Sequence, residues 1–206
     1  MLDARLRRLI DPPLDRVAAL LARTPLTANR ATLLGFAIGL AALPALAAEA
    51  YGLALGLILA NRVFDGLDGA LARRHGVSDL GGFLDISCDF IFYASVPLGL
   101  ALADPSRNAV PAAFLIFSFV GTGSSFLAFA VMAAKRGLSS ELRGRKSLYY
   151  LGGLTEGTET ILVFVLMGLL PGSFWWLAWI FGTLCWLTTL TRFAIAWQVL
   201  RRDAAG

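Results

Sequence analysis

Residues 109–134, AVPAAFLIFSFVGTGSSFLAFAVMAA, form an apolar run in which no side chain is charged. About 20 mostly apolar residues are enough for a helix to cross the hydrocarbon core of a bilayer. Only 16% of the 206 residues are charged, whereas a soluble domain carries about 25%. Similar apolar runs lie between the other charge clusters, and we expect membrane-spanning helices at about 31–48, 52–72, 83–103, 109–134, 157–171 and 174–199. The sequence therefore predicts an all-α integral membrane protein built as a six-transmembrane helix bundle.

The N-terminal segment has a different pattern. Between Leu2 and Ile10, apolar side chains recur at helical spacing with arginines among them, and the Pro12-Pro13 pair is expected to interrupt this helix. An amphipathic helix of this kind can lie in the interface plane with its apolar face in lipid. Packing on the cytoplasmic face of the bundle explains the pattern equally well. We therefore divide a single membrane domain, residues 1–206, into an N-terminal interfacial segment (1–28) and a six-helix bundle (29–200).

The basic residues gather on one side of the predicted bundle. Those that precede the first span or follow the second, fourth and sixth spans are Arg5, Arg7, Arg8, Arg16, Arg23, Arg30, Arg73, Arg74, Lys135, Arg136, Arg143, Arg145, Lys146, Arg201 and Arg202. The opposite side receives only Arg107. This asymmetry satisfies the positive-inside rule and predicts cytoplasmic termini at a bacterial inner (cell) membrane. Basic residues beside an anionic leaflet also account for the net charge of +4 without a nucleic-acid partner.

Two acidic pairs interrupt the apolar pattern. Asp65 and Asp68 are three residues apart and Asp85 and Asp89 are four apart, so each pair lies on one helix face. The short connection at 74–80 should make the two helices antiparallel neighbours, with all four acids at similar depth near the cytoplasmic side. Four carboxylates in a low dielectric need a compensating positive charge. Hard divalent ions supply it and also bind phosphate oxygens, so we predict a site for two ions, Mg²⁺ or Mn²⁺, suited to phosphoryl transfer.

Two other interpretations of these acids were weighed. A single Asp–Arg pair inside a helix bundle is often only a satisfied ion pair, but four acids at helical spacing across a hairpin are more than one pair requires. An ion-coupled transporter also places carboxylates within the membrane. It predicts acids near the midplane, broken helices and internal repeats, whereas this sequence places its acids near one face and has no detectable repeat.

The acidic segment resembles the signature of the CDP-alcohol phosphotransferase (CDP-alcohol phosphatidyltransferase) family. That signature is Asp, two residues, Asp-Gly, two residues, Ala-Arg, a gap, Gly, three residues, Asp, three residues, Asp. Its residues in this chain are Asp65, Asp68, Gly69, Ala72, Arg73, Gly81, Asp85 and Asp89. The six-span plan and the segment 27–32 before the first span, where Thr27 or Asn29 is expected to cap the helix, also resemble the family. The gap after Arg73 is seven residues, one fewer than the family pattern.

The resemblance implies a role for each of these residues. Asp65, Asp68 and Asp85 would ligate the two ions, and Asp89 would complete the site and act as the general base toward the acceptor hydroxyl. The acceptor oxygen would attack the β-phosphorus of a CDP-linked donor, expected to be CDP-diacylglycerol, and CMP would leave. The residues implied to bind the CDP part of the donor are Asn29, Thr32, Gly69, Ala72, Arg73 and Gly81. A homodimer is also implied, and a soluble CDP-alcohol donor with a lipid acceptor is the alternative within the family.

The alcohol acceptor is less certain from the sequence. Glu156 and Glu159 would favour a neutral or cationic alcohol if they face the site, but they fit equally well as acids at a helix N-terminus. The basic residues that would favour a phosphorylated acceptor are Arg143, Arg145 and Lys146. Arg192, inside the last predicted span, would either pair with an acid or face the cavity. The sequence leaves the choice of acceptor open.

Overall fold

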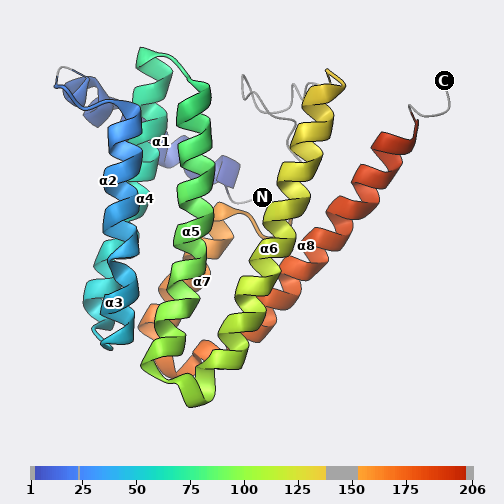
Figure 1. Ribbon diagram of the computed structural model, residues 1–206. Coiled ribbons are helices and arrows are strands. Elements are labelled where there is room, and N and C mark those ends of the chain that lie inside the picture. The colour runs from blue at the N-terminus through green and yellow to red at the C-terminus, as the bar shows by residue number, and fades with distance from the viewer. Residues whose placement is uncertain (1–2, 23, 138–152, 203–206) are drawn as a thin grey trace.

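The computed structural model describes residues 3–22, 24–137 and 153–202, and every regular element within them is helical (Figure 1). The helices are α1 (Asp3–Leu21), α2 (Ala28–Leu40), α3 (Ala42–Ala47), α4 (Tyr51–His75), α5 (Asp79–Ala103), α6 (Pro105–Lys135), α7 (Gly157–Leu169) and α8 (Phe174–Arg202), with a 3₁₀ turn, η2, at Pro171–Ser173. The predicted all-α architecture is confirmed.

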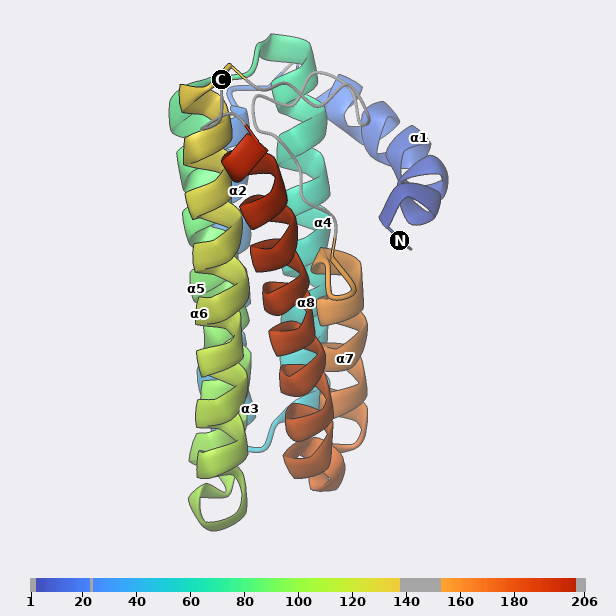
Figure 2. The same cartoon turned by 90° about the vertical axis from the view of Figure 1, so that its right-hand side faces the viewer.

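Four stretches of the described chain are long and apolar enough to cross a membrane. They are Ala28–Ala47, Asp79–Ala103, Pro105–Lys135 and Pro171–Arg201. The first of them joins α2 to α3 and corresponds to the first predicted span. The second predicted span became α4, which is 25 residues long but carries charges at Arg62, Asp65 and Asp68. The fifth became α7, which has only 13 residues and begins part-way along the bundle (Figures 1 and 2).

Polar side chains begin the helices that lead to the acidic segment. Thr27 is the N-cap of α2, because its hydroxyl accepts a hydrogen bond from the Arg30 amide at 3.3 Å; this confirms Thr27, and not Asn29, as the cap. Ser78 caps α5 in the same way, accepting from the Gly81 amide at 3.1 Å. The chain turns between α4 and α5 at Gly76, whose φ of 108° suits glycine. The connection is therefore short, as expected.

The two helices that carry the acids are antiparallel, but the expectation that they pack directly on each other is wrong. Helix α4 packs mainly on α1, α2, α3 and α7, whereas α5 packs on α2, α3 and α6. Helix α2 contacts both, and it can do so because it presents glycines. A Cβ on Gly39 would lie 2.8 Å from the side chain of Asn61 in α4 and 2.8 Å from Phe92 in α5. The spacing of α4 and α5 is thus set by a third helix.

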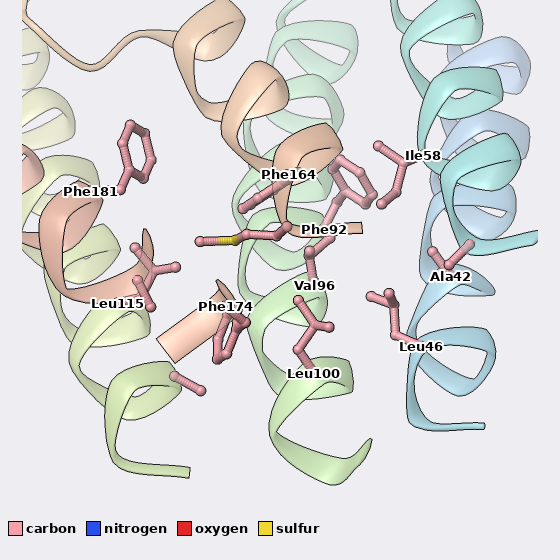
Figure 3. Close-up of a cluster of buried hydrophobic side chains, with 14 of the residues drawn as sticks. Ala42, Leu46, Ile58, Phe92, Val96, Leu100, Leu115, Phe164, Phe174 and Phe181 are labelled. Carbon is pink, nitrogen blue, oxygen red and sulfur yellow. The ribbon is translucent and has the colours of Figure 1, made fainter. Parts of the chain in front are cut away.

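A continuous apolar core joins the remaining helices (Figure 3). Phe92 of α5 lies at its centre and meets Phe164 of α7 edge-on, with ring centroids 6.3 Å apart. Ile58 of α4 and Leu46 of α3 extend the cluster on one side, and Phe181 of α8 extends it on the other. Because aromatic pairs in this arrangement add to the energy of burial, the short α7 is held in place by its packing.

Helix α1 lies outside the bundle, near the end where α4 connects to α5 (Figure 2). It packs on α4, where its buried Ala18 meets Leu71. The expected interruption at the proline pair is wrong, since one helix contains both Pro12 and Pro13. Proline removes hydrogen-bond donors and bends a helix without necessarily ending it.

The turn between α5 and α6 lies at the opposite end of the bundle (Figure 1). Asp104 caps α6 there: its carboxylate accepts from the Ser106 hydroxyl at 2.7 Å and from the Arg107 amide at 3.2 Å. These hydrogen bonds, the Ser106 bond first, lower the pKa of Asp104 below its ordinary value. Asp104 therefore stays ionised at neutral pH, far from the other acids.

The close crossing of α3 and α5 leads to a stability prediction. Gly99 is buried, and a Cβ there would lie 2.8 Å from Leu46 Cβ and 2.9 Å from the Leu43 carbonyl oxygen. Because a main-chain atom cannot move aside cheaply, Gly99→Ala is expected to lower the free energy of unfolding by about 1–3 kcal/mol, measured by thermal unfolding in detergent. The matched control is Gly56→Ala in α4, where no heavy atom lies within 4 Å; equal loss in both variants would contradict the prediction.

Candidate active site

The acids of α4 and α5 meet at one small site. One carboxylate oxygen from each of Asp65, Asp68 and Asp85 lies within 4.8 Å of the other two. Asp68 is buried, Asp65 is half-buried and Asp85 is exposed. Asp89 lines the same hollow one turn further along α5, outside the three-acid group. The predicted convergence of the two acidic pairs is therefore observed.

The three-acid group fits a divalent ion. Hard cations such as Mg²⁺, Mn²⁺ and Ca²⁺ take carboxylate oxygens at about 2.0–2.6 Å, which places ligand oxygens on opposite sides of the ion roughly 4–5 Å apart. The oxygens of Asp65, Asp68 and Asp85 satisfy this limit. The hollow that they line with Asp89 and Thr32 has a volume of about 10 Å³, close to the roughly 10–15 Å³ that a single water requires. Its size and its ligands suit one small cation.

Thr32 of α2 supports the buried acid. Its hydroxyl donates to Asp68 Oδ2 at 2.5 Å, and both side chains are at most 9% exposed. This hydrogen bond comes from a helix that carries none of the four acids, so it links the position of Asp68 to the packing of α2 on α4. Thr32 was predicted to contact the donor; in the structure it contacts a metal-ligand candidate.

Removal of this hydroxyl is expected to weaken ion binding. Thr32→Val keeps the shape of the side chain but leaves Asp68 without the bond that orients it, and loss of such an outer partner typically lowers metal affinity about 10–100-fold. The measurement is a Mn²⁺ titration of the purified protein without substrate. Thr189→Val is the control, because Thr189 is equally buried but donates to the Cys185 carbonyl at 3.0 Å. Unchanged Mn²⁺ affinity in Thr32→Val would contradict this role.

Asp89 has a different environment from the three grouped acids. Its Oδ1 accepts from Arg62 Nη2 at 2.8 Å, and its Oδ2 lies 3.4 Å from the Tyr93 hydroxyl, which donates to it. One oxygen of Asp89 is thus held firmly by a cation, and the other only by a long hydrogen bond. A carboxylate fixed at one oxygen and weakly engaged at the other is suited to accept a proton.

Arg62 and Asn61 belong to the site, and the sequence analysis assigned them no role. Both line the hollow, and Asn61 is 4% exposed. The signal was available: Arg62 lies three residues before Asp65 on the same helix face, within an apolar run where a charge is costly. Cys88 also lines the hollow as a free thiol, in agreement with the prediction that neither cysteine forms a disulfide.

The other residues predicted to bind the donor lie toward the connection between α4 and α5, outside the lining of the hollow. Asn29 and Gly81 meet there, since a Cβ on Gly81 would lie 3.1 Å from Asn29 Oδ1. Arg73 is exposed and pairs with Asp15 of α1 at 3.1 Å. Gly69 and Ala72 lie on the same part of α4 as Arg73. The structure therefore brings Asn29 together with Gly81, and places Arg73 against α1.

The predicted acceptor residues divide into two groups. Arg143, Arg145 and Lys146 lie outside the described residues. Glu156 and Glu159 form a capping box at the start of α7, in which the Glu156 amide donates to Glu159 Oε2 at 3.2 Å. Neither acid lines the hollow. Arg192 of α8 is buried and donates to the Thr122 carbonyl of α6 at 2.9 Å.

Comparison with known proteins agrees with this site. The sequence model of the family described as CDP-alcohol phosphatidyltransferase matches residues 25–191. The chain is 57% identical over 192 residues to the inner membrane protein YnjF of Escherichia coli, covering 93% of each chain. It is 35% identical over 164 residues to the archaetidylinositol phosphate synthase of Pyrococcus horikoshii, covering 79% of this chain and 80% of that protein.

Solved structures share the fold. Phosphatidylinositol phosphate synthase (PgsA1) of Mycobacterium tuberculosis with CDP-DAG bound superposes with a TM-score of 0.72 at 23% identity, covering 89% of this chain and 93% of that chain. The same synthase in complex with manganese and citrate gives a TM-score of 0.71 at 24% identity, covering 89% and 88%. The family match spans the four acids, all the helices from α2 to α7 and most of α8. The chain therefore belongs to the CDP-alcohol phosphatidyltransferase family and is a transferase of phospholipid biosynthesis.

Proposed function

We propose that this protein transfers a phosphatidyl group from CDP-diacylglycerol to the hydroxyl of a polar alcohol and releases CMP. The observation that carries the proposal is the convergence of Asp65, Asp68 and Asp85 within 4.8 Å, with Asp89 held beside them by Arg62. The donor is supported by the CDP-DAG bound to the M. tuberculosis synthase of the same fold. A soluble CDP-alcohol donor is the alternative.

The metal requirement is proposed to be two divalent ions, Mg²⁺ or Mn²⁺, held by Asp65, Asp68, Asp85 and Asp89. A manganese complex of the structurally similar synthase supports this choice. When bound, such ions neutralise the pyrophosphate of the donor and stabilise the charge on the transferred group. The protein supplies the ligands and, through Thr32, the hydrogen bond that orients Asp68.

The proposed reaction depends on the two different oxygens of Asp89. Arg62 holds Oδ1, so Oδ2 accepts the proton of the acceptor hydroxyl in place of its long hydrogen bond from Tyr93. The acceptor oxygen then forms a bond to the β-phosphorus of the donor. The bond from that phosphorus to the bridging oxygen breaks, and CMP leaves with the electron pair. The proton stays on Asp89 until product leaves.

The proposed membrane arrangement has six spans, with α2 and α3 together forming the first and with α1 in the interface. Figure 1 supports it, because the connection between α4 and α5, the end of α6 and the C-terminus lie at one end of the bundle. That end carries Arg73, Arg74 and Lys135 in the last turns of α4 and α6, so we place it in the cytoplasm. The similarity to an E. coli inner membrane protein supports the same membrane here. A homodimer through membrane helices is also proposed.

For the acceptor, we propose a phosphorylated polyol. The argument for a neutral or cationic alcohol needed Glu156 and Glu159 to face the site, and their capping box accounts for both acids at the start of α7. The relatives from P. horikoshii and Methanothermobacter thermautotrophicus are named archaetidylinositol phosphate synthases, which supports an inositol phosphate as the first compound to test.

The deciding experiment measures CMP release by the purified protein with CDP-diacylglycerol and Mn²⁺ or Mg²⁺. The acceptors are inositol phosphate, glycerol phosphate, free inositol and serine, and EDTA is the control. Release that needs both metal and inositol phosphate supports the full proposal. Release with serine or free inositol alone would overturn the acceptor class, and release only from soluble CDP-alcohols would overturn the donor. Absence of release from every donor would favour a non-enzymatic carrier.

A further inference from the structure

Arg62 contacts one acid from each of the two helices that carry the site. Its guanidinium lies 2.8 Å from Asp89 Oδ1 on α5 and 3.5 Å from Asp65 Oδ2 on α4. The Arg62 side chain is 17% exposed, against 36% for Asp65 and 29% for Asp89. This arginine is therefore the inner member of the group and lies between acids that are expected to ligate ions.

The position of Arg62 is fixed by its neighbours. Its Nε and Nη2 both donate to Asn61 Oδ1, at 2.8 Å and 2.5 Å. Asn61 in turn donates to the Gly35 carbonyl of α2 at 2.9 Å. The guanidinium carbon also lies 4.9 Å from the centre of the Phe92 ring, within range of a cation–π contact. Arg62 is thus a built part of the site, and its contacts resist displacement.

A fixed guanidinium affects how the site takes up ions. Arginine keeps its charge inside proteins, so its charge persists beside Asp65 and Asp89 whatever else binds. Asp68 and Asp85 have no printed contact with it, and Asp68 is instead bonded to Thr32. The charge of the site is therefore divided: one side is open to a divalent ion, and the other already has a cation.

We propose that Arg62 is a built-in competitor of the second divalent ion. On this proposal, which rests on the proposed function, the free enzyme binds one ion at Asp65, Asp68 and Asp85. The second ion binds at Asp65 and Asp89 only together with the donor, whose pyrophosphate supplies the compensating negative charge. Arg62 thereby makes assembly of the two-ion site depend on the donor.

The test is a Mn²⁺ titration of the purified protein without substrates, with free Mn²⁺ measured by electron paramagnetic resonance. Wild type is expected to bind one ion, and Arg62→Gln two, with the affinity of the second ion at least tenfold higher than in wild type. Arg62→Lys keeps the charge and is expected to resemble wild type. The control is Arg107→Gln, at the opposite end of the bundle, where Arg107 lies over Trp175; it should bind one ion.

The sign of the change separates competition from a merely structural role. A structural arginine predicts weaker or unchanged Mn²⁺ binding in Arg62→Gln, and either result would overturn the inference. Arg62→Met, which keeps the apolar stem over Phe92, replaces Arg62→Gln if that variant does not fold. A measurement without variants adds CDP-diacylglycerol to wild type, where the stoichiometry is expected to rise from one to two. Two ions without donor would overturn the inference alone, whereas no Mn²⁺ binding at all would overturn the proposed metal site as well.

Discussion

Asp89→Asn is expected to lower CMP release about 10²–10⁴-fold, the usual contribution of a general base. The amide has the shape of the carboxylate, and its oxygen can still accept from Arg62, which bonds Asp89 Oδ1 at 2.8 Å. It cannot take a proton from the acceptor hydroxyl. The protein should therefore fold and bind CDP-diacylglycerol nearly as wild type does. The measurement is the rate of CMP release at saturating donor and acceptor, together with donor affinity by equilibrium binding.

Asp104→Asn is the matched control for this variant. Asp104 is an ionised acid at the opposite end of the bundle, and asparagine caps a helix as well as aspartate does. The control removes the same charge without touching the site, so its turnover should equal that of wild type. Retained turnover in Asp89→Asn would refute the assignment of Asp89 as base, and an equal loss in both variants would point to a nonspecific effect of charge.

Asp68→Asn is expected to act on ion binding first and on rate as a consequence. Asp68 is 7% exposed and receives the Thr32 hydroxyl at 2.5 Å, a bond that an amide oxygen can still accept. The lost charge, however, belongs to the three-acid group. Removal of an outer partner costs about 10–100-fold in metal affinity, so loss of a direct ligand should cost at least about 100-fold, measured by Mn²⁺ titration.

The two aspartate variants should differ in a way that identifies their roles. Because Asp89 lies outside the three-acid group, Asp89→Asn should retain tight binding of the first Mn²⁺ and lose turnover. Asp68→Asn should lose both, and a high concentration of Mn²⁺ should restore part of its turnover. Tight Mn²⁺ binding by Asp68→Asn would show that the ion is held elsewhere.

Much of the fold was predictable because the lipid environment simplifies the pattern. Apolar runs such as 109–134 became helices with nearly the expected bounds, here Pro105–Lys135. The four acids were predictable for the same reason, since a charge within an apolar run is conspicuous. The packing partners were not predictable. A short connection indicates that α4 and α5 are antiparallel, but only side-chain sizes in three dimensions place α2 against both.

The residues that the sequence analysis missed act through contacts between distant segments. Arg62 is next to the signature, yet its partner Asp89 lies 27 residues away, and nothing in the spacing indicates which acid an arginine will reach. Glu156 and Glu159 show the opposite difficulty. Two acids three residues apart at a helix start fit both a cap and a binding site, and the observed hydrogen bonds identify the cap.

The glycines of α2 have a consequence for how such enzymes can change. At Gly39 the main chain of α2 meets Asn61 of one acid-bearing helix and Phe92 of the other, so the width of the reaction centre is a property of backbone thickness. Side-chain substitutions elsewhere leave that width unaltered. A laboratory search for new acceptors can therefore randomise residues outside this contact and retain the phosphoryl-transfer chemistry, whereas Gly39 itself should tolerate no exchange.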